Sequence, residues 1–320
     1  MSEREIAGFL ATVPLLEGRD EADLTELARV MRRRTVPAGD VLWQQGGVAR
    51  EALFVVEGAV SATLQVPGER TVEIGRVGPG QILGEIALLD GQGHTMSVRA
   101  TEATTVLALG RLDFAALLGG RHPAAFALKR RLAGLFTARL RDQLTHLAGS
   151  LGGEAAELSA PALADLEQCR PPDSRYMRRM ATFHDFDPLA LWGFLTSGTY
   201  VRCPPGRTLV AEGTPSPAYF LTVNGAVEKV IVRGDRRIRV GLAGPGKAFG
   251  YESLIDGVPS PLAAVTRERS VLLVLARDHF DQLFHKEDAV ARVFLEAIQR
   301  DLLASLRQTL RPCARLAASV

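Results

Sequence analysis

The side chains with the clearest chemical potential lie together between residues 84 and 100. This run opens with a glycine that leads into a short helical turn, whose backbone N–H groups suit an anion. The carboxylate of Glu85, just inside the turn, can accept hydrogen bonds from a sugar hydroxyl, and two hydroxyl side chains follow. These features predict a site for a small phosphorylated ligand. The candidate ligand-binding residues of this first pocket are Gly84, Glu85, Ile86, Ala87, His94, Thr95 and Ser97.

A second version of this run lies at residues 249–260. The spacing of its glycines and apolar residues is kept, but the residue types at the predicted ligand-binding positions differ. Tyr251 stands at the position of Glu85, and a glutamate follows one place late. Ser260 stands at the position of His94. We therefore expect the second pocket to be the poorer binding site. Its candidate ligand-binding residues are Gly250, Tyr251, Glu252, Ser253 and Ser260.

The repetition extends far beyond these two runs. Residues 36–46 match 203–213, 53–60 match 220–227, 78–80 match 244–246, and 89–91 match 255–257. The offset is 167 or 166 positions, which is much longer than the roughly 20–50 residues of a solenoid unit. The sequence therefore predicts two copies of one whole domain, which also fits a length of 320 residues.

Each copy is expected to run from helices to strands and back to helices. Asp20 is predicted to cap an early helix, and Asp187 with Pro188 to start the equivalent helix of the second copy. After the early helix of the first copy, short apolar runs are separated by turn signals at 37–39, 66–68 and 78–80. This spacing is typical of a β-sandwich or barrel. The predicted domains are residues 1–148, with strands at 35–113 and helices at 114–148, and residues 181–311, joined by a linker at 149–180 and followed by a tail at 312–320.

The closing helix of the second copy carries a long apolar stripe from Val290 to Leu310 at i+4 spacing. Such a stripe packs either against its own domain or against a second copy of the chain. A homodimer through this C-terminal helix is therefore compatible with the sequence, although packing within the chain is the commoner outcome.

Composition excludes several classes of function. The net charge of +2, from 38 basic and 36 acidic side chains, provides no overall field for nucleic acid or for an anionic membrane. The three cysteines are far apart and show no metal spacing, and no run approaches 18 apolar residues. The N-terminus lacks the apolar segment of a signal peptide. We therefore expect a cytoplasmic protein with no metal and no membrane span. No nucleophile is paired with a base, so we also expect no catalytic residues.

On these motifs the chain resembles the cyclic nucleotide-binding domain family, which includes regulatory subunits of cyclic-AMP-dependent protein kinases, gated channels and catabolite activator proteins. The Gly-Glu-Ile-Ala-Leu-Leu run at 84–89 looks like the phosphate-binding cassette of that family. Pro37 and Gly39, and then Phe54, Glu57 and Gly58, match its strand signatures. The resemblance implies a mainly β fold with flanking helices, in which each domain is a jelly-roll-like β-roll and the helix after it acts as a lid.

The resemblance also implies roles for two residues of the first pocket. Glu85 falls at the position of the glutamate that holds the ribose 2′-hydroxyl, and His94 at that of the arginine that pairs with the cyclic phosphate. A guanidinium binds phosphate through two hydrogen bonds and is always charged, whereas histidine offers one donor and a charge that depends on pH. The change from arginine to histidine is expected to weaken this contact.

Two functions are consistent with these observations. The first is a non-catalytic regulatory protein that responds to cyclic AMP or cyclic GMP through the first pocket and acts on an unknown protein effector. The alternative is a ligand-free scaffold that binds a protein partner, which the missing arginines favour. No cofactor is expected beyond the nucleotide ligand. About ten residues follow Leu310, so we expect no DNA-binding helix-turn-helix after the second domain.

Overall fold

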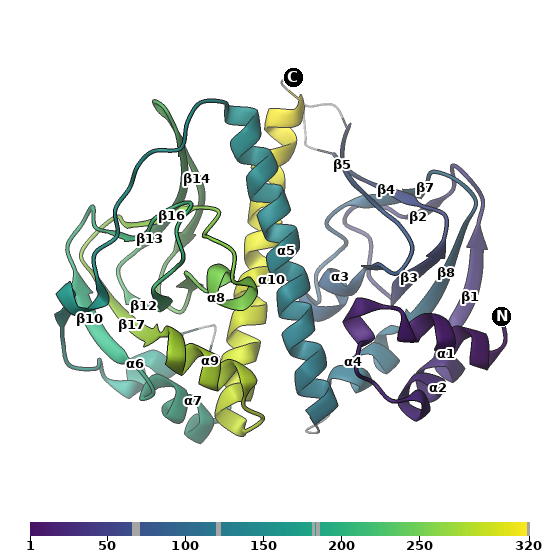
Figure 1. Ribbon diagram of the computed structural model, residues 1–320, viewed down its shortest axis with the longest axis horizontal. Coiled ribbons are helices and arrows are strands. Elements are labelled where there is room, and N and C mark those ends of the chain that lie inside the picture. The colour runs from purple at the N-terminus through teal and green to yellow at the C-terminus, as the bar shows by residue number, and fades with distance from the viewer. Residues whose placement is uncertain (66–70, 120–122, 181–182, 184–185, 319–320) are drawn as a thin grey trace. The chain divides into compact units, whose positions relative to one another are not determined.

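The computed structural model describes residues 1–65, 71–119, 123–180, 183 and 186–318 (Figure 1). The chain divides into two compact units, which are Met1–Arg131 with Ala314–Val320 and Leu132–Cys313. The boundary falls inside the long helix α5 (Pro123–Leu151). The second unit therefore contains residues 132–148, which the sequence assigned to the first domain, and the whole predicted linker at 149–180. The turn predicted at 66–68 lies outside the described residues.

Unit 1 contains two four-stranded antiparallel sheets that face one another, in the orders β1-β8-β3-β6 and β2-β7-β4-β5. Its core is formed by apolar side chains from both sheets, such as Leu53, Val60 and Val106. The elements are α1 (Glu3–Ala11), η1 (Pro14–Leu16), α2 (Glu21–Val30), β1 (Arg32–Val36), β2 (Val41–Trp43), β3 (Glu51–Glu57), β4 (Val60–Gln65), β5 (Thr71–Val77), β6 (Ile82–Leu83), α3 (Glu85–Asp90), β7 (Ser97–Ala100), β8 (Thr104–Gly110), α4 (Arg111–Gly119) and the start of α5.

Unit 2 has the same topology, with sheets ordered β15-β12-β17-β10-β9 and β11-β16-β13-β14. Each strand from β10 to β17 corresponds to the strand nine places earlier in the numbering, so the repeat predicted from the sequence is confirmed. The elements after α5 are η2 (Leu163–Asp165), β9 (Glu167–Gln168), α6 (Ser174–Arg178), α7 (Pro188–Leu195), β10 (Thr199–Cys203), β11 (Thr208–Val210), β12 (Ala218–Asn224), β13 (Val227–Arg233), β14 (Arg236–Ala243), β15 (Ala248–Phe249), α8 (Glu252–Asp256), β16 (Ala263–Thr266), β17 (Ser270–Ala276), α9 (Arg277–His285) and α10 (Ala289–Ala318).

Local sequence explains where the early helices of each unit begin. The side chain of Asp20 accepts a hydrogen bond from the Asp23 N–H group at 2.7 Å, which satisfies a free donor at the start of α2. Asp187 accepts hydrogen bonds from the N–H groups of Leu189 and Ala190 at the start of α7. Both predicted helix caps are confirmed.

The two units differ at one sheet edge. In unit 2, the short strand β9 from the predicted linker pairs with β10, with Val201 opposite Gln168. In unit 1, the equivalent strand β1 is the last strand of its sheet. It carries Arg32, Arg33 and Arg34, which are all exposed. The same edge is thus covered in one unit and charged in the other.

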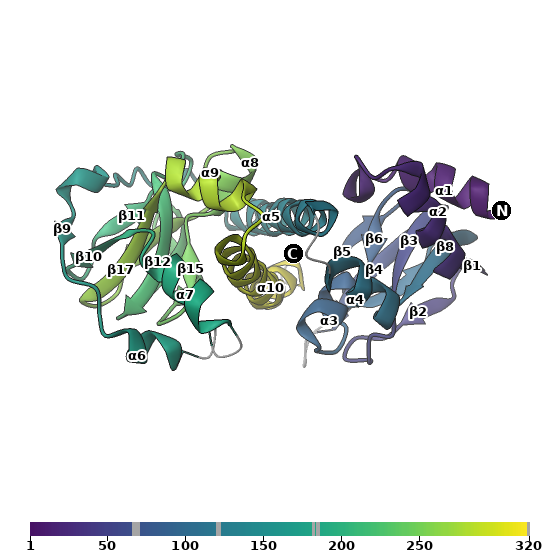
Figure 2. The ribbon, with the colours of Figure 1, turned by 90° about the horizontal axis from the view of Figure 1, so that it is seen from below.

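Helix α10 packs against the part of α5 that belongs to unit 2 (Figures 1 and 2). Thr309 donates a hydrogen bond to the side chain of Gln143 at 2.5 Å, and the Cys313 thiol donates to the Gln143 carbonyl at 3.4 Å. The predicted apolar stripe of α10 is buried; Phe294, for example, packs edge-on against Tyr219 and Phe280. Dimerisation through this helix stays a prediction.

Candidate functional site

The first cassette, residues 84–97, begins at a turn that requires glycine. Gly84 has a φ of +82°, and a Cβ atom there would lie 2.8 Å from the carbonyl oxygen of Glu51. Because both the conformation and the space exclude other residues, Gly84 fixes the direction in which α3 leaves the sheet. Glu85 follows at once and is completely buried. The cassette therefore holds a carboxylate inside the domain at the position predicted to bind a ribose.

His94 lies at the other end of the first cassette and is also buried, with 7% of its surface exposed. Its ring stacks on the indole of Trp43, with ring centroids 4.3 Å apart and planes inclined by 8°. The same indole approaches Gly84, because one of its carbons lies 3.4 Å from the position of a Gly84 Cβ atom. Trp43 thus connects the two ends of the cassette. The sequence analysis did not single out Trp43 for this role.

The turn after β2 holds the far end of the first cassette through its backbone. Gly46 donates a hydrogen bond to the His94 carbonyl at 2.8 Å, and His94 donates to the Gly47 carbonyl at 2.9 Å. The Gln45 N–H group donates to the hydroxyl of Ser97 at 3.0 Å. The hydroxyl of Ser97 therefore has a structural partner. The remaining predicted residues follow the same segment: Ile86 and Thr95 are half-buried, and Ala87 is buried.

The second cassette, residues 250–260, begins at an equivalent glycine. Gly250 has a φ of +81°, and a Cβ atom there would lie 2.8 Å from the Ala218 carbonyl oxygen. Tyr251 then takes the place of Glu85, is completely buried, and donates a hydrogen bond to Asp301 of α10 at 2.5 Å. Burial raises the pKa of Tyr251 well above its ordinary value, and nearby carboxylates act in the same direction. Tyr251 therefore remains a neutral donor that ties the cassette to α10.

The two serines predicted for the second pocket are buried and already bonded. The Ser253 hydroxyl accepts a hydrogen bond from the Ser216 N–H group at 3.1 Å. The Ser260 hydroxyl, at the position of His94, donates to the Leu262 carbonyl at 2.8 Å. The Ser260 O–H group is therefore already used within the protein, whereas Ser253 takes part as an acceptor; ligand binding by either serine stays a prediction.

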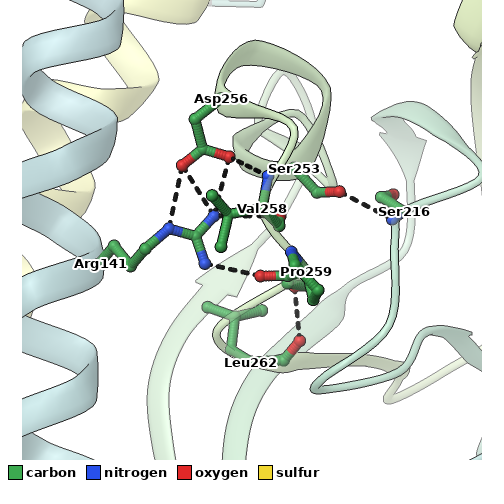
Figure 3. A network of polar contacts seen from close by, with 8 residues as sticks. Arg141, Ser216, Ser253, Asp256, Val258, Pro259 and Leu262 are labelled. Atoms are coloured by element: carbon green, nitrogen blue, oxygen red, sulfur yellow. Dashed lines mark hydrogen bonds and ion pairs between the residues drawn. The ribbon is translucent and has the colours of Figure 1, made fainter.

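An arginine that the sequence analysis did not single out binds the second cassette from α5 (Figure 3). Arg141 donates to the carboxylate of Asp256 from Nε at 2.9 Å and from Nη2 at 3.0 Å. It also donates to the carbonyl oxygens of Pro259 at 2.6 Å and Val258 at 3.3 Å. The planar guanidinium matches this set of acceptors, since it can pair with a carboxylate through two parallel bonds. The loop is therefore held by a side chain of the protein itself.

Behind Tyr251 lies a buried group of charged side chains. Lys229 of β13 donates a hydrogen bond to Ser305 at 2.8 Å, and its ammonium lies 3.9 Å from the carboxylate of Asp301. Glu252 is almost fully buried, and within the described residues its Oε1 atom has no hydrogen-bond partner. Burial raises the pKa of the Glu252 carboxyl, although Lys229 acts in the opposite direction.

This shift predicts how stability responds to pH. A carboxyl whose pKa is raised on folding stabilises the protein below its unfolded pKa of 4.5, and this stabilisation is lost as pH rises through the folded value. We expect Glu252→Gln to raise the melting temperature by about 2–4 °C at pH 8, or roughly 1 kcal/mol. The difference should shrink as the pH falls towards 4.5. Melting curves of both proteins across this range provide the measurement, and a difference independent of pH would contradict the expectation.

In the described part of the chain, no group of three or more His, Cys, Asp or Glu side chains is arranged to hold a metal ion. None of the helices described combines the length and apolar character needed to cross a bilayer.

Comparison with known families identifies the class of these domains. Residues 33–120 and 200–287 each match the family described as cyclic nucleotide-binding domain. Together the matches cover more than half of the chain and coincide with the two β-rolls. The chain belongs to the cyclic nucleotide-binding domain family, and it carries two such domains in tandem.

Parts of the chain are similar to proteins of several kinds. A cyclic nucleotide-gated potassium channel of Mesorhizobium japonicum is 38% identical over 106 residues, which are 33% of this chain and 28% of the channel. The cyclic AMP receptor protein of Thermus thermophilus is 31% identical over 129 residues, 40% of this chain and 58% of the relative. The solved regulatory domain of Toxoplasma gondii PKA with cAMP is 17% identical, with a TM-score of 0.36 and coverage of 91% of this chain and 94% of that domain. The chain matches only about a third or less of the length of such channels.

Proposed function

We propose that the protein is a non-catalytic regulator that binds cyclic AMP or cyclic GMP in the first cassette alone and passes the signal to a protein effector. The contrast between the two cassettes carries this proposal. The first keeps a glycine turn followed by a buried glutamate. In the second, Tyr251 is hydrogen-bonded to Asp301, and Asp256 is hydrogen-bonded to Arg141.

The residues of the first cassette suit this ligand. The carboxylate of Glu85 can accept a hydrogen bond from the ribose 2′-hydroxyl, as the matching glutamate does elsewhere in the family. The imidazole of His94 can donate one hydrogen bond to the cyclic phosphate. Its stacking on Trp43 fixes the orientation of the ring, which reduces the entropy lost on binding.

A specific observation favours the alternative of a ligand-free scaffold. The first cassette lacks the arginine of its family, and the histidine in that place already packs against Trp43. In this alternative, both domains serve only to present surfaces to a protein partner.

Calorimetric titration of the whole chain with cyclic AMP and with cyclic GMP distinguishes the two functions. The proposal expects one nucleotide bound per chain, together with a rise in melting temperature that grows with ligand concentration. Two bound nucleotides would contradict the assignment of the second cassette as structural. An absence of heat and of any thermal shift at millimolar nucleotide would favour the scaffold.

Restoring the family arginine should strengthen binding. We expect His94→Arg to lower the dissociation constant for cyclic AMP about tenfold, because a charged bidentate donor exceeds a single neutral one by about 1–2 kcal/mol. Ser260→Arg in the second cassette is the matched variant, and it should create no second binding event. Titration of both variants provides the measurement, and weaker binding by His94→Arg would count against a phosphate at this position.

A further inference from the structure

A cavity of about 310 Å³ lies in unit 2 at a place that neither cassette includes. It is a half-open pocket lined by the segment before α6, by α6 and α7, and by the start of β10, and its walls are mainly apolar. The residues that matter for its chemistry are Pro171, Pro172, Met177, Trp192 and Leu195. Ligand pockets in proteins usually have volumes of about 300–1,000 Å³, so this cavity has room for a large side chain rather than for a whole cofactor.

The surface around the cavity exposes large apolar side chains. Trp192, which lines the cavity, is 47% exposed, and Leu189, one helical turn earlier on α7, is 79% exposed. Tyr176 on the neighbouring helix α6 is 45% exposed. Figure 2 shows α6 and α7 close together at the edge of unit 2. Tryptophan and tyrosine are enriched where proteins bind one another, and exposed apolar clusters mark interaction sites.

The same surface carries positive charge. Four exposed arginines each lie within two residues of a residue that lines the cavity, and no ion pair is shown for any of them in the part of the chain that the structure describes. They are Arg170, Arg175, Arg178 and Arg179. Among the described residues, Asp173 and Asp187 accept hydrogen bonds from the first turns of α6 and α7, and Glu167 pairs with Arg202 at 2.8 Å. The surface is therefore both apolar and basic.

We propose that this α6–α7 surface binds an acidic segment of a partner protein. A large apolar side chain of the segment enters the cavity beside Trp192, and its carboxylates pair with the surrounding arginines. Arginine and tryptophan are the residues that most often dominate binding energy in such interfaces. A peptide is favoured over a bilayer or a nucleic acid backbone because the cavity is a single concave site of side-chain size beside exposed arginines. The proposal goes beyond nucleotide binding and does not require an occupied first cassette.

Selection of random peptides displayed on bacteriophage, with the whole chain immobilised, tests this proposal. The expected enriched sequences combine Asp or Glu with Trp, Phe or Leu. A fluorescein-labelled peptide of the enriched sequence is then titrated by anisotropy. We expect Trp192→Ser to weaken its binding about tenfold or more. We expect the double variant Arg175→Glu, Arg178→Glu to do the same, and salt to weaken binding to the wild-type chain.

Two exposed positions elsewhere provide matched controls. Leu112→Ser removes an apolar side chain that is 83% exposed in unit 1, and Arg269→Glu reverses an exposed charge in unit 2; both should leave the peptide affinity unchanged. No enrichment, enrichment without acidic residues, or full binding to Trp192→Ser would overturn the proposal. The proposal would also be overturned if phosphatidylserine vesicles or single-stranded DNA bound at the same residues more strongly than the peptide. Cyclic nucleotide titration of the same variants separates a failure here from a failure of the first cassette.

Discussion

Replacing Glu85 with glutamine is expected to weaken cyclic nucleotide binding by roughly ten- to a hundredfold. Glutamine has the size of glutamate, so the completely buried site should keep its packing. The substitution changes a charged acceptor into a neutral one, and hydrogen bonds to charged groups contribute about 1.5–3 kcal/mol. Titration calorimetry with cyclic AMP and cyclic GMP measures the loss, and circular dichroism checks that the variant is folded.

The repeat supplies a matched control for this experiment. Glu252 is a buried glutamate in the second cassette, one position later in the frame. Glu252→Gln should leave nucleotide affinity unchanged, because we assign no ligand to that cassette. Equal losses in the two variants would indicate a general effect of buried carboxylates on the fold. Unchanged binding by Glu85→Gln alone would remove Glu85 from the site.

Replacing Arg141 with methionine is expected to destabilise unit 2 by about 2 kcal/mol. The side chain is 17% exposed and its partner Asp256 is 21% exposed, so the ion pair is partly shielded from water. The substitution also removes the hydrogen bonds from the guanidinium to two loop carbonyls, and hydrogen bonds that involve a charged group contribute about 1.5–3 kcal/mol. Urea unfolding of the variant and the wild-type chain measures the difference.

An exposed ion pair in the same unit is the control for Arg141. Arg237 is 51% exposed and pairs with Glu228 at 2.8 Å, so Arg237→Met should cost at most about 0.5 kcal/mol. A double-mutant cycle of Arg141→Met with Asp256→Asn should give a coupling energy of about 1 kcal/mol or more. Additive effects would show that the two side chains do not depend on one another.

The repeated sequence allowed the main architecture to be predicted. Turn residues at fixed offsets fixed where strands begin and end, and the caps at Asp20 and Asp187 fixed two helix starts, because these features depend on neighbouring residues. The changes at Tyr251 and Ser260 also predicted that the second pocket is the poorer binding site. Their present partners could not be predicted, because Arg141 and Asp256 are separated by 115 positions and no local pattern joins them.

Trp43 is a different case, because the sequence did contain a signal. At the offset of 167 positions its counterpart is Val210, and at the offset of 166 positions Ser260 is the counterpart of His94. The stacked pair of Trp43 and His94 therefore exists only in the first copy, and both members differ in the second. Trp43 lies on β2, outside the cassettes, so its replacement by Val210 is visible only where the whole copies are aligned.

The sheet edge formed by β1 in unit 1 and by β10 in unit 2 is protected differently in the two units. This difference bears on how a duplicated domain avoids self-association. An unpaired strand offers its N–H and C=O groups to any other strand, and two rolls of the same topology in one chain are natural partners for such pairing. In unit 2 these groups on β10 are partly used by β9. In unit 1, β1 carries three exposed arginines; Arg34 pairs with Glu51 at 3.1 Å, and the charges of Arg32 and Arg33 disfavour pairing with a second copy of this strand. The duplicated domain thus protects the same sheet edge by two different means, a covering strand in one copy and charged side chains in the other.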